Sequence, residues 1–257
     1  MCGRFVVSVP DLAELAQAFG IVTDRSGVWL PHFNIAPTDL APVITNEPER
    51  ALAQMHFGLQ PFWAKSKATA GSSKPKSGAS MINARVETIA SKPAYKKALE
   101  QRRCIIPVSG YYEWKKIGGR KQPLYIHAQN GKLIPLSGVW ERWTTRDGEV
   151  IESFAIVTRA AAGFMNDIHD RMPLEVPKDA IDLWLDPKPK TEDQLAAILK
   201  SSAGTEHLVA HPVSTLVNSV SNDAPELIDP VKPEPEPQLD LFAAPSEAKH
   251  RAKHRKS

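Results

Sequence analysis

The chain has 257 residues, of which 42% are apolar, and a formal net charge of +3. This apolar content is enough to bury a large core, so wholesale disorder is excluded. No run reaches the roughly 18 apolar residues that a membrane helix needs, and two cysteines are too few for a disulfide framework. We therefore expect a cytoplasmic protein of a reducing compartment, with no membrane association.

Short strand-like segments outnumber helices along most of the chain. Residues 11–19 have helical periodicity, with a capping-box pattern beginning at Asp11 and Gly20 placed just after the end. Apolar or β-branched runs bounded by turn residues then predict strands at 41–45, 51–57, 104–109, 124–128, 133–139 and 153–158. Helical patterns return near the end of the chain, at 178–185 and 192–200.

Two glycine turns indicate how some of these strands pair. Asn130-Gly131 and Asp147-Gly148 are both typical of tight β-hairpins. The strands follow one another instead of alternating with helices, which favours an α+β fold of mainly antiparallel sheets with flanking helices. We expect one such domain over residues 2–231.

Two segments differ from the rest in composition. Residues 65–80 contain four Lys, five Ser and two Gly, and are interpreted either as a solvated insertion or as a basic flap near a polyanion. Residues 232–257 begin with Pro alternating with Glu and Lys and end almost wholly basic, so we expect a disordered tail. Six Lys/Arg less four Asp/Glu give this tail +2, which leaves the body at +1. Nucleic-acid binding by the body would therefore need local patches.

The second residue carries the first chemical signal. Cys2 follows the initiator methionine, and a small second residue permits methionine removal. Processing would leave an amine with a pKa of about 7.7–8.0 and a thiol with a pKa of about 8.5 on one residue. Such a 1,2-aminothiol condenses with an aldehyde to a Schiff base, which the thiol closes to a thiazolidine ring. Taken alone, however, Cys2 is better interpreted as incidental.

Other short blocks of sequence along the chain make a chemical role for Cys2 the better interpretation. Seven short blocks of sequence follow one another at residues 1–5, 34–37, 82–88, 104–107, 110–115, 169–173 and 211–214. In this order they closely resemble the SRAP family, the abasic-site processing proteins first labelled SOS response-associated peptidases. The resemblance spans about residues 2–231 and implies that the processed Cys2 crosslinks to abasic sites in single-stranded DNA. An abasic sugar in its open form is an aldehyde, so this implication agrees with the aminothiol chemistry.

The resemblance also implies a catalytic set, which consists of Cys2, Asn83, Glu113 and His169. Glu113, in an aromatic setting, would move protons to and from the amine and the sugar oxygen. His169 would protonate the ring oxygen, and Asn83 would orient the sugar or the amine. Without the resemblance, Glu113 would be taken for an exposed strand residue and His169 for half of a structural hydrogen bond to Asp170.

A second set would contact the DNA, and it consists of Arg4, Arg85, Arg171, Trp63, Asn34, Pro37 and Thr158. We expect at least two of the three arginines to bind phosphate, because a planar guanidinium matches phosphate oxygens. Each of them could instead pair with Glu87 or Asp170. Trp63 could stack on a base or lie in the core, with about equal weight.

The tail carries one apolar cluster, at residues 238–242, formed by Gln238, Leu239, Leu241 and Phe242. It resembles the short peptide by which bacterial replication and repair proteins bind the β sliding clamp, and a docking segment for the body is the alternative.

Three functions stay open for the whole chain: covalent capture of abasic sites, a cysteine peptidase with Cys2 as nucleophile and His169 as base, and a noncovalent scaffold on single-stranded DNA. The scattered histidines and the lack of nucleotide-binding glycine patterns lead us to expect no metal and no cofactor. We expect a monomer associated with the nucleoid.

Overall fold

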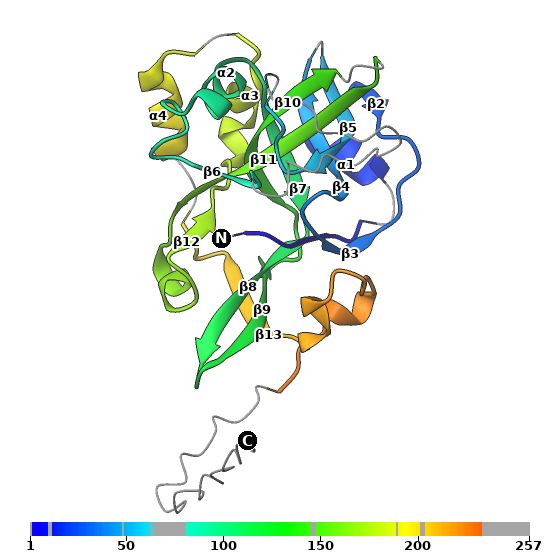
Figure 1. Cartoon of the computed structure of the whole chain (residues 1–257), viewed down its shortest axis with the longest axis vertical. Coiled ribbons are helices and arrows are strands. Elements are labelled where there is room, and N and C mark those ends of the chain that lie inside the picture. Colours follow the sequence, from blue (N-terminus) through cyan, green and yellow to red (C-terminus); the bar gives the residue numbers. More distant parts are fainter. Residues whose placement is uncertain are drawn as a thin grey trace, which may run out of the picture.

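The computed structural model describes residues 2–9, 12–47, 49–61, 63, 81–144, 148–188, 190–200 and 204–232. Within these ranges the chain forms two β-sheets with helices at their margins (Figure 1). A large apolar core contains residues of both sheets, and a smaller apolar cluster packs on the opposite face of the smaller sheet. Most strand pairs are antiparallel, so the predicted α+β class is confirmed.

The smaller sheet carries the amino terminus, and its five strands have the order β13-β9-β8-β1-β3. Their bounds are β1 (Phe5–Val7), β3 (His32–Ile35), β8 (Gly110–Ile117), β9 (Arg120–Ala128) and β13 (Leu208–Pro212). Side chains alternate between the faces, so Tyr111 lies in the main core while Tyr112 lies in the smaller cluster. Glu113, two residues after Tyr111, shares the face of Tyr111.

The larger sheet has eight strands, in the order β12-β11-β10-β7-β4-β5-β2, with β6 paired to β11. Their bounds are β2 (Thr23–Arg25), β4 (Leu40–Asn46), β5 (Arg50–Phe57), β6 (Asn83–Arg85), β7 (Arg103–Val108), β10 (Ile134–Thr144), β11 (Val150–Ala160) and β12 (Arg171–Pro173). The six predicted strands are confirmed as parts of β4, β5, β7, β9, β10 and β11, although β9, β10 and β11 extend several residues beyond the predicted bounds.

One of the two predicted hairpins is confirmed and the other is wrong. β10 and β11 pair down to Thr144 opposite Val150, on either side of the turn that contains Gly148. Asn130-Gly131 also turns the chain, with a φ of 70° at Gly131, but β9 pairs with β8 and β13 while β10 pairs with β7 and β11. This turn therefore passes the chain from one sheet to the other, because turn chemistry specifies a local reversal and not the partner of the next strand.

The α-helices lie around the larger sheet (Figure 1). The predictions at 11–19 and 192–200 are confirmed by α1 (Leu12–Phe19), which ends before Gly20 at a φ of 62°, and by α4 (Glu192–Lys200). The predicted helix at 178–185 begins as a 3-10 turn, η3 (Lys178–Ala180), and continues as α3 (Ile181–Leu185). The remaining elements are α2 (Pro93–Gln101), η2 (Gly163–Asp167), η4 (Thr215–Asn218) and η5 (Pro225–Ile228).

Several predictions from the sequence fall on residues that the structure does not describe: the cap at Asp11, the flap at 65–80 and the tail after residue 232. Among the helices that it does describe, none combines the length and the apolar character needed to cross a membrane.

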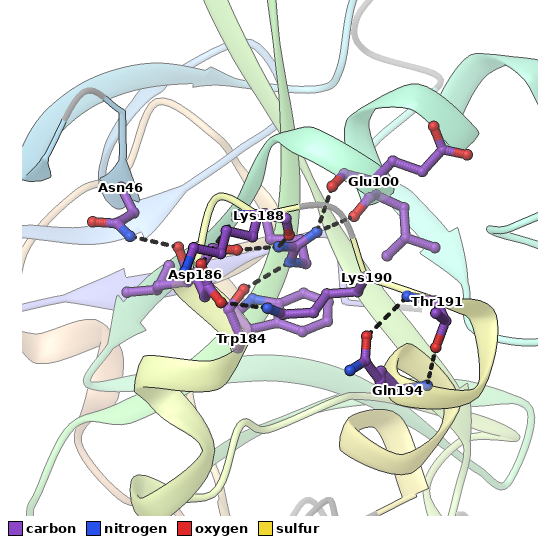
Figure 2. Close-up of polar contacts among 11 residues, drawn as sticks. Asn46, Glu100, Trp184, Asp186, Lys188, Lys190, Thr191 and Gln194 are labelled. Atoms are coloured by element: carbon purple, nitrogen blue, oxygen red, sulfur yellow. Dashed lines mark hydrogen bonds and ion pairs between the residues drawn. The ribbon is translucent and has the colours of Figure 1, made fainter.

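The buried side chain of Arg103 links the end of α2 by hydrogen bonds to α3 and to the residues that follow it. Arg103 is 4% exposed, and burial lowers the pKa of its guanidinium group. The group donates to main-chain carbonyls of Leu99 and Glu100 in the last turn of α2, at 2.7 Å each, where the helix dipole favours a positive charge. It also donates to the carbonyls of Trp184 at 2.7 Å, Asp186, and Lys188 at 3.3 Å (Figure 2). This set of contacts, the Arg103 staple, fixes the end of α2.

Candidate functional site

Cys2 lies wholly buried next to Glu113 because of the way β1 pairs with β8. Phe5 stands opposite Tyr111, and the Tyr112 N–H donates to the Arg4 carbonyl at 2.9 Å, so the residues before Phe5 run alongside Glu113. Cys2 is 0% exposed and Glu113 is 2% exposed. Strand pairing therefore brings Cys2 and Glu113, two members of the predicted catalytic set, together in a buried position.

The Cys2 thiol is held in its protonated form. Burial raises its pKa, and the charge of Glu113 raises it further, while the positive amino terminus and a hydrogen bond from the Arg4 main-chain N–H act in the opposite direction. This direction applies to the chain that still carries Met1, and the pKa values expected for the processed Cys2 stay a prediction. A buried thiol becomes a nucleophile when a neighbouring group takes its proton, and Glu113 is the carboxyl group beside it.

Asn83 contacts Cys2 from the other sheet. It lies at the start of β6, beside Ile156 of β11, and its side-chain Nδ2 donates to the Cys2 carbonyl at 2.9 Å. Its Oδ1 is buried and has no hydrogen-bond partner among the residues described. Tyr95 of α2 donates its hydroxyl to the Asn83 carbonyl at 3.1 Å. Figure 1 shows the amino terminus between β6 and β8, which carry Asn83 and Glu113.

Tyr111 connects this place to the turn that carries His169. Burial raises the pKa of the Tyr111 hydroxyl, and the nearby Cys2 and Glu113 add to that effect. The hydroxyl contacts Met165 Sδ at 3.8 Å, within η2, and the Met165 carbonyl accepts the His169 N–H at 2.9 Å. The turn that bears His169 is therefore packed against the same tyrosine that borders Cys2.

His169 is partly exposed, and its Nδ1 has two different partners. The Asp170 carboxylate lies 2.6 Å from Nδ1, and the Arg171 main-chain N–H donates to the same atom at 2.9 Å. The carboxylate requires a proton on Nδ1, whereas the N–H requires a lone pair. The two contacts with Nδ1 thus favour different positions of the ring proton.

Arg171 is paired within the protein. Its guanidinium binds the Glu87 carboxylate with two hydrogen bonds, at 2.6 and 3.0 Å, and donates to the Thr158 carbonyl at 2.6 Å. The hydrogen bond from Arg171 lowers the pKa of Glu87. Thr158 is fully buried beneath this pair, with its hydroxyl 3.4 Å from the guanidinium. This is the Glu87 pairing that the sequence left open.

Arg4 and Asn34 together hold a C-terminal segment against the smaller sheet. Arg4 donates to Asn34 Oδ1 at 2.7 Å and to the Val217 carbonyl at 2.9 Å, and it lies 5.9 Å from the Trp114 ring centroid. Burial lowers the pKa of Arg4. The Asn34 amide, 3% exposed, donates to the main-chain carbonyls of residues 217, 219 and 222 at 3.3, 3.0 and 2.7 Å. Both side chains thus have structural partners.

The other predicted contact residues are more open. Arg85 lies exposed in β6, and Trp63 is 57% exposed, which places its side chain outside the core. Pro37 is partly buried and precedes Thr38, whose φ of 81° marks a tight turn. The clamp-like segment at 238–242 lies outside the described residues. Across the described ranges, no group of three or more His, Cys, Asp or Glu side chains is arranged to hold a metal ion.

Tyr95 is the site residue that the sequence reasoning missed. Its helix did carry signals: Pro93 at the first turn, followed by apolar residues at Tyr95, Ala98 and Leu99 with helical spacing. Those signals predict a buried helix face, but the contact with Asn83 joins segments 12 residues apart in the chain and depends on the tertiary fold.

Comparisons with a family model and with known proteins agree on one family. The family model "SOS response associated peptidase (SRAP)" matches residues 1–220. The chain is 35% identical over 236 residues to the abasic site processing protein YoaM of Bacillus subtilis (strain 168), covering 89% of this chain and 98% of that protein. It is 32% identical over 235 residues to the abasic site processing protein YedK of Escherichia coli (strain K12), covering 90% and 100%. It is 32% identical over 273 residues to the abasic site processing protein HMCES of Gallus gallus, covering 90% and 78%.

The fold has a match among solved structures as well. A crystal structure of a Bacteroides thetaiotaomicron protein matches with a TM-score of 0.77 and 24% identity, over 90% of this chain and all of that one. At this identity the likeness supports the fold. Together with the family match over most of the chain, these findings show that the protein belongs to the SRAP family.

Proposed function

We propose that this protein senses abasic sites in single-stranded DNA and captures them covalently through Cys2 once Met1 has been removed. Several relatives are named as abasic site processing proteins. The observation that carries the proposal is the buried arrangement of Cys2 between the Glu113 carboxyl group and the Asn83 amide. In this arrangement, the amine and the thiol with which Cys2 would attack an aldehyde lie beside two groups, Glu113 and Asn83, that can transfer a proton or accept a hydrogen bond.

The proposed reaction forms two bonds and releases one water. The Cys2 amine attacks the aldehyde carbon of the open sugar, and loss of water leaves an imine. The Cys2 sulfur then adds to the imine carbon, and the thiol proton ends on the nitrogen, which closes a thiazolidine. No oxidant or reductant is required, and the same proton transfers in reverse open the ring slowly.

Each polar group has a role in this proposal. Glu113 carries the proton from sulfur to nitrogen, which is the step that a thiol with a raised pKa needs most. His169 donates a proton to the ring oxygen as the sugar opens. Asn83 holds the Cys2 carbonyl through Nδ2, and its buried Oδ1 is the acceptor for an N–H of the processed amine.

The proposed DNA contacts divide into direct and supporting residues. The exposed Arg85 binds a phosphate, and the exposed Trp63 stacks on a base next to the lesion. For Arg171 and Arg4, a phosphate has to compete with Glu87 and Asn34 respectively. Asn34, Pro37 and Thr158 shape the wall of the site. Clamp binding by residues 238–242 stays a prediction from the sequence.

The peptidase alternative is less well supported. A cysteine peptidase needs a thiolate, which a neighbouring positive charge favours. Here burial and the negative Glu113 disfavour the thiolate of Cys2 more than the positive amino terminus and the Arg4 main-chain N–H favour it. A noncovalent scaffold would bind DNA without any adduct, so covalent capture is the property to test.

Two substitutions at Cys2 test the proposal on a denaturing gel with an oligonucleotide that carries one abasic site. Cys2→Ala should lose the stable adduct, because no thiol remains to trap the imine, while borohydride should still trap the imine of the Ala amine. Cys2→Ser should give a labile adduct, since only an oxygen ring can close. Cys104→Ala, which removes the other buried thiol, is the control and should crosslink normally. A stable adduct with Cys2→Ala would contradict the proposal.

A further inference from the structure

We propose that Tyr95 is a positioning residue for crosslinking, and that it acts on Cys2 through Asn83. This inference rests on the proposed function. Its basis is two hydrogen bonds in series, from the Tyr95 hydroxyl to the Asn83 carbonyl at 3.1 Å and from Asn83 Nδ2 to the Cys2 carbonyl at 2.9 Å. Helix α2 is thereby linked to the residue that carries both reactive groups.

The link matters because β6 is short. It has three residues, Asn83–Arg85, which pair with residues 156–158 of β11. Asn83 is the first of them, so it lies at the end of the strand. The hydroxyl of Tyr95 therefore anchors the end of β6 that carries the catalytic side chain.

The anchor itself is rigid. Tyr95 is 6% exposed and packs into the core with Ala98 and Leu99 on the buried face of α2. The Arg103 staple holds the last turn of the same helix. Burial raises the pKa of Tyr95, so its hydroxyl keeps the proton that it donates at neutral pH. The position of the hydroxyl is thus set by the helix and transmitted to Asn83.

Loss of this hydroxyl should affect the chemistry and leave DNA affinity unchanged. Tyr95 is buried behind Asn83, so it makes no direct contact with a DNA strand on the surface. A reacting group held within a fraction of an ångström of its productive position reacts faster, and a freer Asn83 would let Cys2 leave that position more often. One net hydrogen bond corresponds to a loss of about three- to tenfold in the crosslinking rate constant.

The test compares Tyr95→Phe with Tyr112→Phe in single-turnover crosslinking, with the DNA concentration varied. Tyr112 is a matched control because it is fully buried and its hydroxyl donates to the Phe33 carbonyl at 2.8 Å, on the opposite face of β8. Tyr95→Phe should lower the rate constant at saturating DNA about three- to tenfold and leave the half-saturating concentration unchanged. Tyr112→Phe should crosslink within about twofold of the original protein.

A second comparison asks whether the effect passes through Asn83. In an Asn83→Ala background, Tyr95→Phe should have no further effect on the rate constant, because the side-chain hydrogen bond from residue 83 to Cys2, through which Tyr95 acts, is already absent. Multiplicative losses in the double variant, equal losses in both Tyr variants, or an unaffected Tyr95→Phe would each overturn this inference alone. An original protein with free Cys2 that forms no adduct would overturn the proposed function and this inference with it.

Discussion

Replacing Arg103 by Met should destabilise the fold strongly, because the Arg103 staple donates hydrogen bonds to five main-chain carbonyls. Met fills much of the volume of the arginine stem but donates no hydrogen bond. The substitution removes five hydrogen bonds to main-chain carbonyls, and two of them, to Leu99 and Trp184, lie in fully buried surroundings (Figure 2).

The magnitude follows from those two buried carbonyls. Each buried acceptor that is left without a donor costs about 1–3 kcal/mol, while the other three carbonyls are closer to water. The variant also recovers the cost of burying the charge, which is the cost that lowers the pKa of Arg103. We expect a net loss of about 3 kcal/mol in the free energy of unfolding, or about 6–12 °C in Tm for a chain of this size.

Urea unfolding followed by tryptophan fluorescence measures this loss, since Trp184 belongs to the same cluster. Arg142→Met is the matched control: the Arg142 side chain is 43% exposed and pairs with Glu152 at 2.7 Å, an arrangement worth about 1 kcal/mol or less. The reasoning would be refuted if Arg103→Met lay within about 1 kcal/mol of the original protein, or matched the Arg142 variant.

Three further predictions concern DNA binding, the ion pair of Arg171, and stability at alkaline pH. Arg85→Ala should weaken binding to single-stranded DNA and reduce the slope of log K against log salt by about 0.7, one phosphate contact. Arg171→Ala should cost about 1–3 kcal/mol of stability, because it removes two hydrogen bonds to the Glu87 carboxylate and one to the Thr158 carbonyl. Salt titrations of DNA binding check the Arg85 variant, and urea unfolding checks the Arg171 variant. An unchanged salt slope for Arg85→Ala would show that Arg85 does not contact a DNA phosphate. Burial raises the pKa of Cys104 well above its ordinary value, so its contribution to stability is complete below about pH 8.5 and declines as pH rises. Cys104→Ala should therefore reduce the fall in unfolding free energy between pH 9 and 10 by about 1.4 kcal/mol per pH unit, and an identical slope in both proteins would contradict the assignment.

The long strands of this fold were predictable and their partners were not. Mostly apolar runs such as 51–57 and 153–158 match β5 and β11 because a strand buried on both faces needs little from context. The three-residue strands β6 and β12 have no such pattern, because pairing with β11 defines them. Asn130-Gly131 failed as a hairpin signal for the same reason, since the sheet that each flanking strand joins is decided by packing.

The candidate site, like the fold, was only partly predictable from the sequence. Residue types alone suggested an aminothiol at Cys2, and the family blocks added Asn83, Glu113 and His169. The burial of Cys2, which raises the pKa of its thiol, depends on the pairing of β1 with β8 and could not be read from the chain. The arginines show the limit most clearly: Arg4, Arg85 and Arg171 look alike in sequence, but Arg85 is exposed while the other two bind Asn34 and Glu87.

Intact-protein mass spectrometry, before and after mixing with an oligonucleotide that carries one abasic site, tests the central claim most directly. The protein alone should lack the mass of Met1. After mixing and denaturation, its mass should increase by that of the oligonucleotide less one water, since imine formation releases water and ring closure releases nothing. A protein with a free amino-terminal cysteine that gains no mass would contradict covalent capture by Cys2.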